Sequence, residues 1–406
     1  MTPLAIPVFS DGWIAHVAEL SRVQLGFSHL HGARLSRAVA DISHTYTRER
    51  TALAELRGDG SLYSARLQFF LSRDLLKIHG PLAELGSVDA LPRARRWRVL
   101  DLGAGLGATS LGVARFAALS GKADSLEVCA LDIDPEALEL YAELARDVRT
   151  LPGAPITLQT YAHDLTSGRL PAAARGPFDL IVTGFALNEL AADGSQGDAL
   201  QRILAYAELL SEDGSLIILE PALRETSRAL HALRDRLGAR AASPFVFAPC
   251  LHTAPCPMLA RERDFCHERI PYELPPSLAA LAASAGLRER DLTYSYLTLH
   301  RQARSLRELG DAAAPGSDPA RLYRAVSGQL ASKGKREVWL CGPSGAPRAM
   351  RLDRHARDHN AAFEAAERGC VASFSGVADS DGARLRVTAE SHVALVQAWT
   401  TRDADD

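Results

Sequence analysis

The feature that most constrains this chain is residues 99–110, which read Val-Leu-Asp-Leu-Gly-Ala-Gly-Leu-Gly-Ala-Thr-Ser. An apolar run leads into a turn with glycine at every second position, namely Gly103, Gly105 and Gly107. Glycine lets the backbone turn sharply and approach a ligand where a Cβ would collide. The stretch therefore predicts a buried strand, a tight turn and a helix at the ligand-binding edge of an open α/β sheet.

Asp101 stands two residues before the first glycine, and the dinucleotide-binding fingerprint spaces its glycines more widely. The pattern Asp-x-Gly-x-Gly-x-Gly resembles motif I of the class I S-adenosylmethionine-dependent methyltransferases. The resemblance implies a Rossmann-like α/β methyltransferase sheet, with cofactor contacts from Asp101, Gly103, Gly105 and Gly107. An NAD-type Rossmann domain, or a glycine turn without a ligand, is the alternative.

Later strands support this interpretation. Residues 126–131 form a second apolar strand that ends at Asp132, and a carboxylate at a strand end can accept both ribose hydroxyls. A third strand, residues 156–161, precedes His163-Asp164, and Asp164 matches the acid on the adenine side in that family. The fourth and fifth strands are expected at residues 178–183 and 215–220.

Asn188 and Glu189 follow the predicted fourth strand, where methyltransferases of this class place groups that face the methyl donor. They are the candidate catalytic residues, and they either orient a nucleophile or cap the next helix. The chain has no Asn-Pro-Pro-Tyr tetrapeptide and no cysteine at this strand end. This segment therefore does not identify the methyl acceptor, and whether the protein is an active enzyme stays open.

Length and composition limit the remaining possibilities. A chain of 406 residues is expected to hold two or three domains, and a net charge of −3 gives no global case for nucleic acid. No apolar run approaches the length of a membrane span, and residues 1–11 do not resemble a signal peptide. We expect a cytoplasmic monomer with an N-terminal helical region (1–95), a methyltransferase-like domain (96–310) and a small β-rich domain (311–406).

The N-terminal region is predicted to be mostly helical from residue 14 to 78, because apolar residues recur at three- and four-residue spacings. Its arginines, including Arg66, are interpreted as solvated groups beside core faces. The linker that follows carries Arg93, Arg95, Arg96 and Arg98 around Trp97. It is either a solvated linker or a site that grips RNA phosphates and stacks on a base.

An insertion at residues 247–270 holds Cys250, Cys256 and Cys266 between prolines. The prolines exclude a helix or a central strand. The segment has few apolar neighbours, so packing in a core does not explain why it is rich in cysteine. Binding of a metal would explain it. The spacing is too wide for the usual structural zinc pairs and suits an iron-sulfur cluster, with zinc as the alternative and His252 and His267 as reserve ligands.

A cluster needs a fourth thiolate, and Cys341 is the best candidate because a strand end and a glycine turn expose it. Cys129 and Cys370 are interpreted as ordinary buried thiols. The motifs Ala-Pro-Cys250-x-His252, Cys256-Pro and Phe-Cys266-His resemble the methyltransferase-like assembly proteins of the mitochondrial small ribosomal subunit and their bacterial relatives.

That resemblance implies S-adenosylmethionine binding, a 4Fe-4S cluster on Cys250, Cys256, Cys266 and Cys341, and association with the small ribosomal subunit or its RNA. A methyltransferase that acts on a small molecule or a protein is the alternative function. In the tail, strands are expected at residues 323–326, 337–340, 348–352, 371–374 and 385–387, with a helix at 358–368. The tail is an RNA-binding barrel or, more simply, a cap that delivers Cys341.

Overall fold

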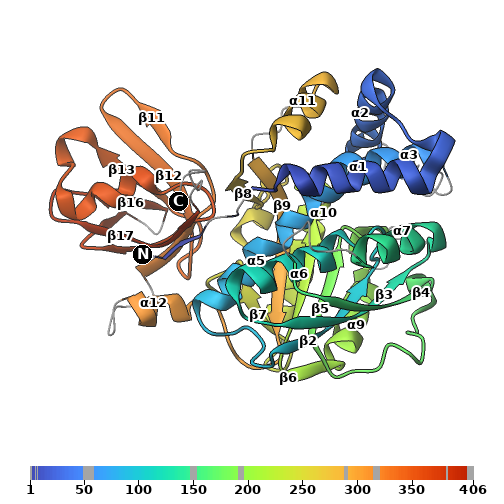
Figure 1. Ribbon diagram of the computed structural model, residues 1–406. Coiled ribbons are helices and arrows are strands. Elements are labelled where there is room, and N and C mark those ends of the chain that lie inside the picture. The colour runs from blue at the N-terminus through green and yellow to red at the C-terminus, as the bar shows by residue number, and fades with distance from the viewer. Residues whose placement is uncertain are drawn as a thin grey trace.

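The computed structural model describes residues 2–4, 6, 8–48, 59–146, 153–190, 196–287, 291–313, 321–380 and 383–399. Three parts are visible: a large sheet with its helices, a group of N-terminal helices above it, and a β-rich domain at the left (Figure 1). None of the helices in these ranges is long and apolar enough to cross a membrane.

The large sheet has eight strands in the order β4-β3-β2-β5-β6-β9-β7, and β8 pairs with β9. β2 to β6 are parallel to one another, whereas β9 runs antiparallel to both β6 and β7. This is the strand order of the class I methyltransferase fold, so the predicted fold class is confirmed. The strands are β2 (Arg96–Leu102), β3 (Ser125–Asp132), β4 (Ile156–Ala162), β5 (Phe178–Gly184), β6 (Leu210–Glu220), β7 (Phe245–Ala248), β8 (Glu268–Pro271) and β9 (Asp291–His300).

Both faces of the central strands are buried, as a parallel sheet with crossover helices requires. Val99 packs in one apolar cluster with the N-terminal helices, whereas the next residue, Leu100, packs in another on the opposite face. Cys129 belongs to this second cluster and is buried as expected. The helices of this part are α6 (Ala108–Ser120), α7 (Pro135–Arg146), α8 (Leu187–Leu190), α9 (Gln196–Ala207), α10 (Arg224–Gly238), α11 (Pro276–Ser284) and α12 (Glu308–Ala313), with 3-10 turns η6 (Leu165–Ser167) and η7 (Pro257–Ala260).

The N-terminal region is helical as predicted, although residues 49–58 lie outside the described ranges. Its apolar face packs on the large sheet, and Trp13 is fully buried there. The elements are α1 (Asp11–Leu25), η1 (Gly26–Ser28), α2 (Gly32–Arg48), α3 (Gly60–Ala65), a π-helical segment η3 (Arg66–Leu71), α4 (Ser72–Asp74), η4 (Leu75–Ile78) and α5 (His79–Ser87).

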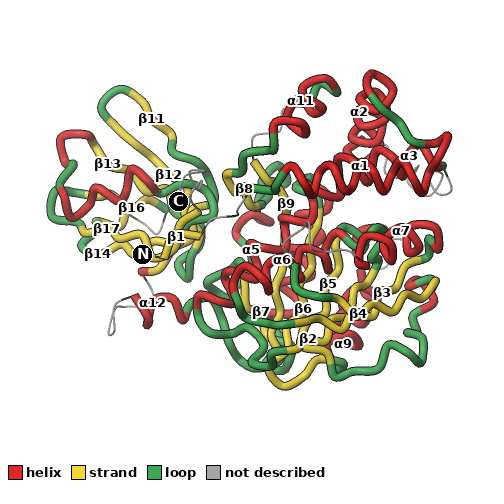
Figure 2. Tube along the Cα trace, viewed as in Figure 1, coloured by secondary structure: helices red, strands yellow, loops and turns green. Residues whose placement is uncertain are grey.

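The C-terminal domain is a second sheet in the order β1-β17-β14-β10-β12-β13-β16-β15, and β11 pairs with β12. Residues 2–4 join it as β1, parallel to β17, so the first and the last described strands lie side by side in this domain (Figure 1). The predicted strands are present (Figure 2). The expected helix is a 3-10 segment, η10. Bounds are β1 (Thr2–Leu4), β10 (Leu322–Ala325), β11 (Leu330–Ser332), β12 (Lys335–Cys341), β13 (Arg348–Leu352), η9 (Asp353–His355), η10 (Asp358–Ala365), β14 (Val371–Ser375), β15 (Ala378–Ser380), β16 (Arg384–Val387) and β17 (His392–Trp399).

Candidate functional site

A cavity of about 590 Å³ lies at the carboxyl ends of the parallel strands, closed on one side by the N-terminal helices. Open α/β sheets bind ligands at this edge. The predicted site residues that line the cavity are Gly103, Gly105, Asp132, Asp164 and Asn188.

The glycine turn after β2 forms the floor of the cavity and needs glycine at each of its three positions. Gly103, Gly105 and Gly107 all have positive φ, at 73°, 51° and 78°. A Cβ on Gly103 would stand 2.3 Å from the Cβ of Ala186, and one on Gly107 would stand 2.2 Å from the ring of Tyr141. Gly107 begins α6 beneath the turn, whereas Gly103 and Gly105 present their backbone to the cavity.

Asp132, at the end of β3, is tied to the glycine turn. Its Oδ2 accepts the amide of Gly105 at 2.7 Å, and its Oδ1 accepts the amide of Asp134 at 2.9 Å. Burial raises the pKa of Asp132, and these two amides oppose that effect. The carboxylate is therefore held rigidly on the cavity wall, with lone pairs left for a further donor.

Asp101 differs from the expectation of a direct cofactor contact, because its side chain is fully buried beneath the turn. Its Oδ2 accepts the hydroxyl of Ser110 at 2.5 Å, and that hydroxyl also contacts the hydroxyl of Tyr141. Burial raises the pKa of Asp101 to about 7. The residue braces strand β2 against α6 and α7, so we assign it a positioning role.

The other two strand ends carry polar groups that are largely engaged with the backbone. Asp164 begins η6 and accepts the amide of Thr166 at 2.8 Å. Asn188 lies shortly after the end of β5. Its side-chain amide donates to the carboxylate of Glu220, and its backbone amide donates to the same carboxylate at 3.1 Å. This capping contact favours the structural interpretation of Asn188, and the side chain of Glu189 lies outside the described part of the chain.

The N-terminal helices contribute cavity residues that sequence reasoning missed. Arg66, Arg73 and Lys77 line the cavity, and Arg66 Nη2 would lie 3.1 Å from a Cβ on Gly105. Arg66 was expected to be solvated, but Asp134 attracts it to the cavity, with 3.8 Å between charged atoms. The spacing of these cations, seven and then four residues, is the signal that they share one helix face.

The same helices are anchored to the sheet through Asp134. The hydroxyl of Tyr63 donates to both oxygens of this buried carboxylate, at 2.7 and 2.8 Å. Asp134 also accepts the amide of Ala137 at 3.1 Å, which starts α7. The wall of the cavity that holds Arg66 is thereby fixed relative to Asp132.

A second, small cavity of about 30 Å³ gathers the four predicted cysteine ligands. Three of them come from the insertion after β7, and Cys341 comes from the end of β12 in the C-terminal domain. His252 Nε2 lies 3.4 Å from Cys341 Sγ, whereas His267 stacks on Phe265 and is not among the cavity residues. The cavity is lined by Leu230, His231, Arg234, Pro249, Cys250, His252, Cys256, Met258, Cys266, Tyr296, Leu297 and Cys341.

Helix α10 holds this insertion in place. Arg228 donates to the carbonyl oxygens of Arg261 and Asp264, each at 2.8 Å. His231 accepts the amide of Cys266 at 3.0 Å, and Asp235 accepts the amide of Cys256 at 2.9 Å. Polar side chains at successive turns of one helix thus hold the insertion, in addition to buried apolar residues such as Leu251.

Burial raises the pKa of all four thiols, and their mutual proximity raises those of Cys256, Cys266 and Cys341 further; that of Cys256 reaches about 11. In the described residues, no group of three or more His, Cys, Asp or Glu side chains has the geometry of a single-ion site. Cys370 is buried elsewhere, as expected.

The structure does not favour the alternative interpretation of the basic linker before β2, a site that grips RNA. Trp97 is fully buried in the sheet, so it cannot stack on a base. Arg95 pairs with Asp124, and Arg96 and Arg98 pair with Glu127. Carboxylates therefore engage these three arginines, with Glu127 shared by two of them, which favours the interpretation of this segment as a solvated linker.

Comparison with known proteins adds three findings. A family model described as "Mitochondrial small ribosomal subunit Rsm22" matches residues 87–368. A release factor glutamine methyltransferase of Deinococcus radiodurans is 31% identical over 144 residues, which is 36% of this chain and 45% of that relative, so the match spans less than half of its length.

Solved methyltransferases are also similar, although distantly. An S-adenosylmethionine-dependent methyltransferase from Clostridium acetobutylicum is 15% identical, with 52% of this chain and 64% of that one covered at a TM-score of 0.28. A precorrin-6y C5,15-methyltransferase from Geobacter metallireducens is 13% identical, with 54% and 88% covered at a TM-score of 0.29.

Proposed function

This chain belongs to the Rsm22 family of mitochondrial small ribosomal subunit proteins, and from that membership we propose an S-adenosylmethionine-binding protein that associates with the small ribosomal subunit. The observation that carries the proposal is the 590 Å³ cavity, where the glycine turn and Asp132 meet at the strand ends. The cytoplasmic location and the monomeric state remain predictions, and the family description is mitochondrial.

Each wall of the cavity suits one part of that cofactor. Asp132 is the candidate acceptor for the ribose hydroxyls and Asp164 the candidate for the adenine edge, and the backbone of Gly103 and Gly105 permits close approach. Arg66 supplies a cation for the methionine carboxylate. A bound S-adenosylmethionine would supply an activated methyl group.

Calorimetric titration with S-adenosylmethionine tests this proposal. Hydrogen bonds to a charged acceptor contribute about 1.5 to 3 kcal/mol each, so Asp132→Ala is expected to weaken affinity at least tenfold. Glu139→Gln, at an exposed position of α7, is the matched control and should bind as the wild type does. Unchanged affinity in Asp132→Ala, with an unchanged melting temperature, would remove the assignment.

We further propose that Cys250, Cys256, Cys266 and Cys341 hold a 4Fe-4S cluster. Three thiols of one insertion and a fourth from β12 converge on one cavity, and α10 holds the insertion with hydrogen bonds. Such a cluster needs four thiolates around a body larger than one ion. It would join the C-terminal domain to the core, because Cys341 belongs to β12.

Anaerobic purification tests the cluster directly. The protein should be brown, with about four irons per chain, and each Cys→Ser change at the four positions should lower iron content and protease resistance. Cys129→Ser and Cys370→Ser are the controls and should retain iron. A colourless preparation with one zinc per chain would replace the cluster with a zinc site, for which His252 is the reserve ligand.

A methyltransferase that acts on a protein is the second candidate function, favoured by the identity to a release factor glutamine methyltransferase. Copurification separates the two candidates. Association with the small subunit predicts that its RNA accompanies the protein and is lost at high salt. The second candidate predicts no RNA, together with methyl transfer to a protein substrate.

A further inference from the structure

The outer face of the C-terminal sheet carries a group of side chains that the functions above do not use. Along β12, Val338 and Leu340 point into the domain core, whereas Trp339 on the opposite face is 37% exposed. Lys335 shares the face of Trp339, since side chains alternate along a strand. Trp339 is a large aromatic exposed where a packed sheet would bury it.

The strand register adds cations and apolar groups around this tryptophan. Trp339 pairs with Arg348 of β13, and Arg348 in turn pairs with Arg384 of β16. Arg386 lies in the next row of the same face. Leu330, 47% exposed in β11, pairs with Glu337 two residues from Trp339. We call Trp339, Lys335, Arg348, Arg384 and Arg386 the outer platform.

The charge balance of the outer platform is positive. Lys335 and Arg348 share one carboxylate, Glu337, at 3.0 and 2.6 Å. Arg384 and Arg386 are exposed and have no ion pair among the described residues. Among the side chains that the structure describes, four cations of this surface thus face one anion, an excess of three positive charges.

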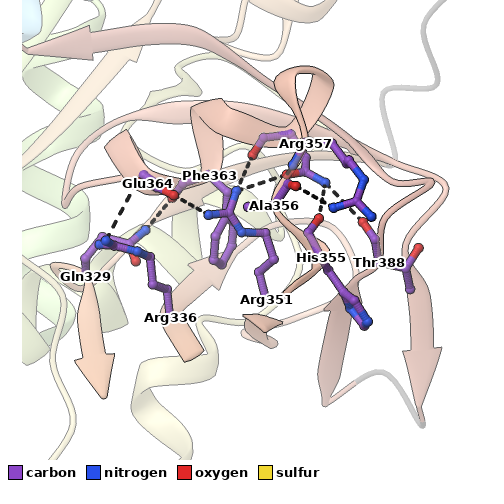
Figure 3. Close-up of polar contacts among 10 residues, drawn as sticks. Gln329, Arg336, Arg351, His355, Ala356, Arg357, Phe363, Glu364 and Thr388 are labelled. Carbon is purple, nitrogen blue, oxygen red and sulfur yellow. Dashed lines mark hydrogen bonds and ion pairs between the residues drawn. The ribbon is translucent and has the colours of Figure 1, made fainter. Parts of the chain in front are cut away.

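The opposite face of the same strands shows the contrast. There Arg336 and Arg351 both pair with Glu364 of η10, and Arg351 also donates to Asn360 at 2.9 Å (Figure 3). Arg351 is covered by the domain, with 1% of its side chain exposed, and both arginines share the carboxylate of Glu364. The outward arginines Arg384 and Arg386 lack such a cover in the described part of the chain.

Trp339 is also placed for stacking. The guanidinium of Arg348 lies over its ring, with 5.8 Å to the centroid. Trp13 and Trp97 are fully buried, and Trp399 is half-buried. An aromatic ring flanked by cations on a sheet face is the arrangement that binds single-stranded nucleic acid, because bases stack on the ring while phosphates meet the cations.

We propose that the outer platform binds single-stranded RNA, with one base stacked on Trp339 and phosphates held by Arg384 and Arg386. The choice of RNA rests on the proposed association with the small ribosomal subunit and on the excess of positive charge. Trp339 stands two residues before Cys341. The proposed cluster on the four cysteines, here called the cysteine centre, would therefore fix the platform relative to the core.

Fluorescence anisotropy with a labelled twelve-nucleotide oligouridine tests the proposal on the full chain. Trp339→Ala is expected to weaken binding about five- to a hundredfold, and Trp339→Phe should restore part of it. The Arg384→Gln/Arg386→Gln double change should reduce the salt slope by about 1.4, or 0.7 for each phosphate contact. Phe27→Ala and Arg34→Gln/Arg37→Gln, which alter exposed groups of η1 and α2, are the controls.

Binding of the Trp339→Ala variant within twofold of wild type, with unchanged melting temperature, would overturn the proposal. So would Trp339-dependent binding to phosphatidylglycerol vesicles or polyglutamate in place of oligouridine. Cosedimentation with small ribosomal subunits separates the two levels. If wild type binds oligouridine but not subunits, the proposed function fails alone; if it binds subunits and Trp339→Ala still binds oligouridine, only the platform fails.

Discussion

Arg324 joins the C-terminal domain to the core through two buried carboxylates. Its Nη1 lies 2.8 Å from Glu84 of α5, and its Nε lies 3.0 Å from Glu268 of β8. All three side chains are at most 4% exposed, and the hydroxyl of Tyr296 also donates to Glu84. One guanidinium therefore compensates two anions at the domain interface.

Arg324→Met keeps most of the side-chain length but leaves both carboxylates unpaired in the interior. Removing one partner of a buried ion pair costs about 3 to 5 kcal/mol, because the remaining charge cannot be hydrated. We expect a loss of this size in the free energy of unfolding and faster proteolysis between the two domains. Replacing all three residues together, as Arg324→Met with Glu84→Gln and Glu268→Gln, should recover much of the loss.

The loss should also depend on pH with a definite sign. Burial raises the pKa of Glu84, and Arg324 opposes that effect. Without Arg324 the native pKa rises further above the unfolded value, so stability is retained at low pH and lost as pH rises through it. Urea denaturation at pH 5 and pH 8 measures this. A loss below about 1 kcal/mol, or one equal at both pH values, would refute the reasoning.

Three further predictions concern the cavity and the linker. Since the pKa of Asp101 is about 7 in the native state, the wild type should lose up to about 4 kcal/mol between pH 4 and 8, and Asp101→Asn should remove this dependence in urea titrations. Arg66→Gln should weaken S-adenosylmethionine binding about tenfold by calorimetry, from loss of one charge-assisted hydrogen bond. Arg95→Gln should leave the salt slope of RNA binding unchanged, because Asp124 already neutralises Arg95.

The parallel part of the fold was predictable because its signals are local. Strands that are buried on both faces appear in the sequence as short apolar runs. The turn after β2 is recognised by its three glycines, which have positive φ. The position of Asp132 follows from the end of its strand. Local patterns of this kind depend on neighbours within a few residues, so one sequence contains them in full.

The rest depends on contacts between distant segments, which no single stretch encodes. In the sequence Arg66 resembles any solvated helical arginine, and only the fold brings Asp134 close to it. Asp101 resembles a cofactor contact, and only the fold shows that it accepts a hydrogen bond from Ser110 in the interior. The pairing of β1 with β17 joins the two ends of the chain. Cys341 is an exception to this rule. An iron-sulfur cluster needs four thiolates and the insertion holds three, so the sequence alone predicted that a distant cysteine would join them.

One face of strand β12 connects these observations. Cys341 at its end lies beside His252 of the core, and Trp339 two residues earlier lies on the exposed part of the same face. Arg324, which pairs with Cys341 in the strand register, enters the buried ion network at the interface. If the proposed 4Fe-4S cluster is bound by the four cysteines, its removal is expected to loosen the domain that carries the outer platform and to leave the cofactor cavity intact. RNA binding and S-adenosylmethionine binding should then respond separately to iron removal.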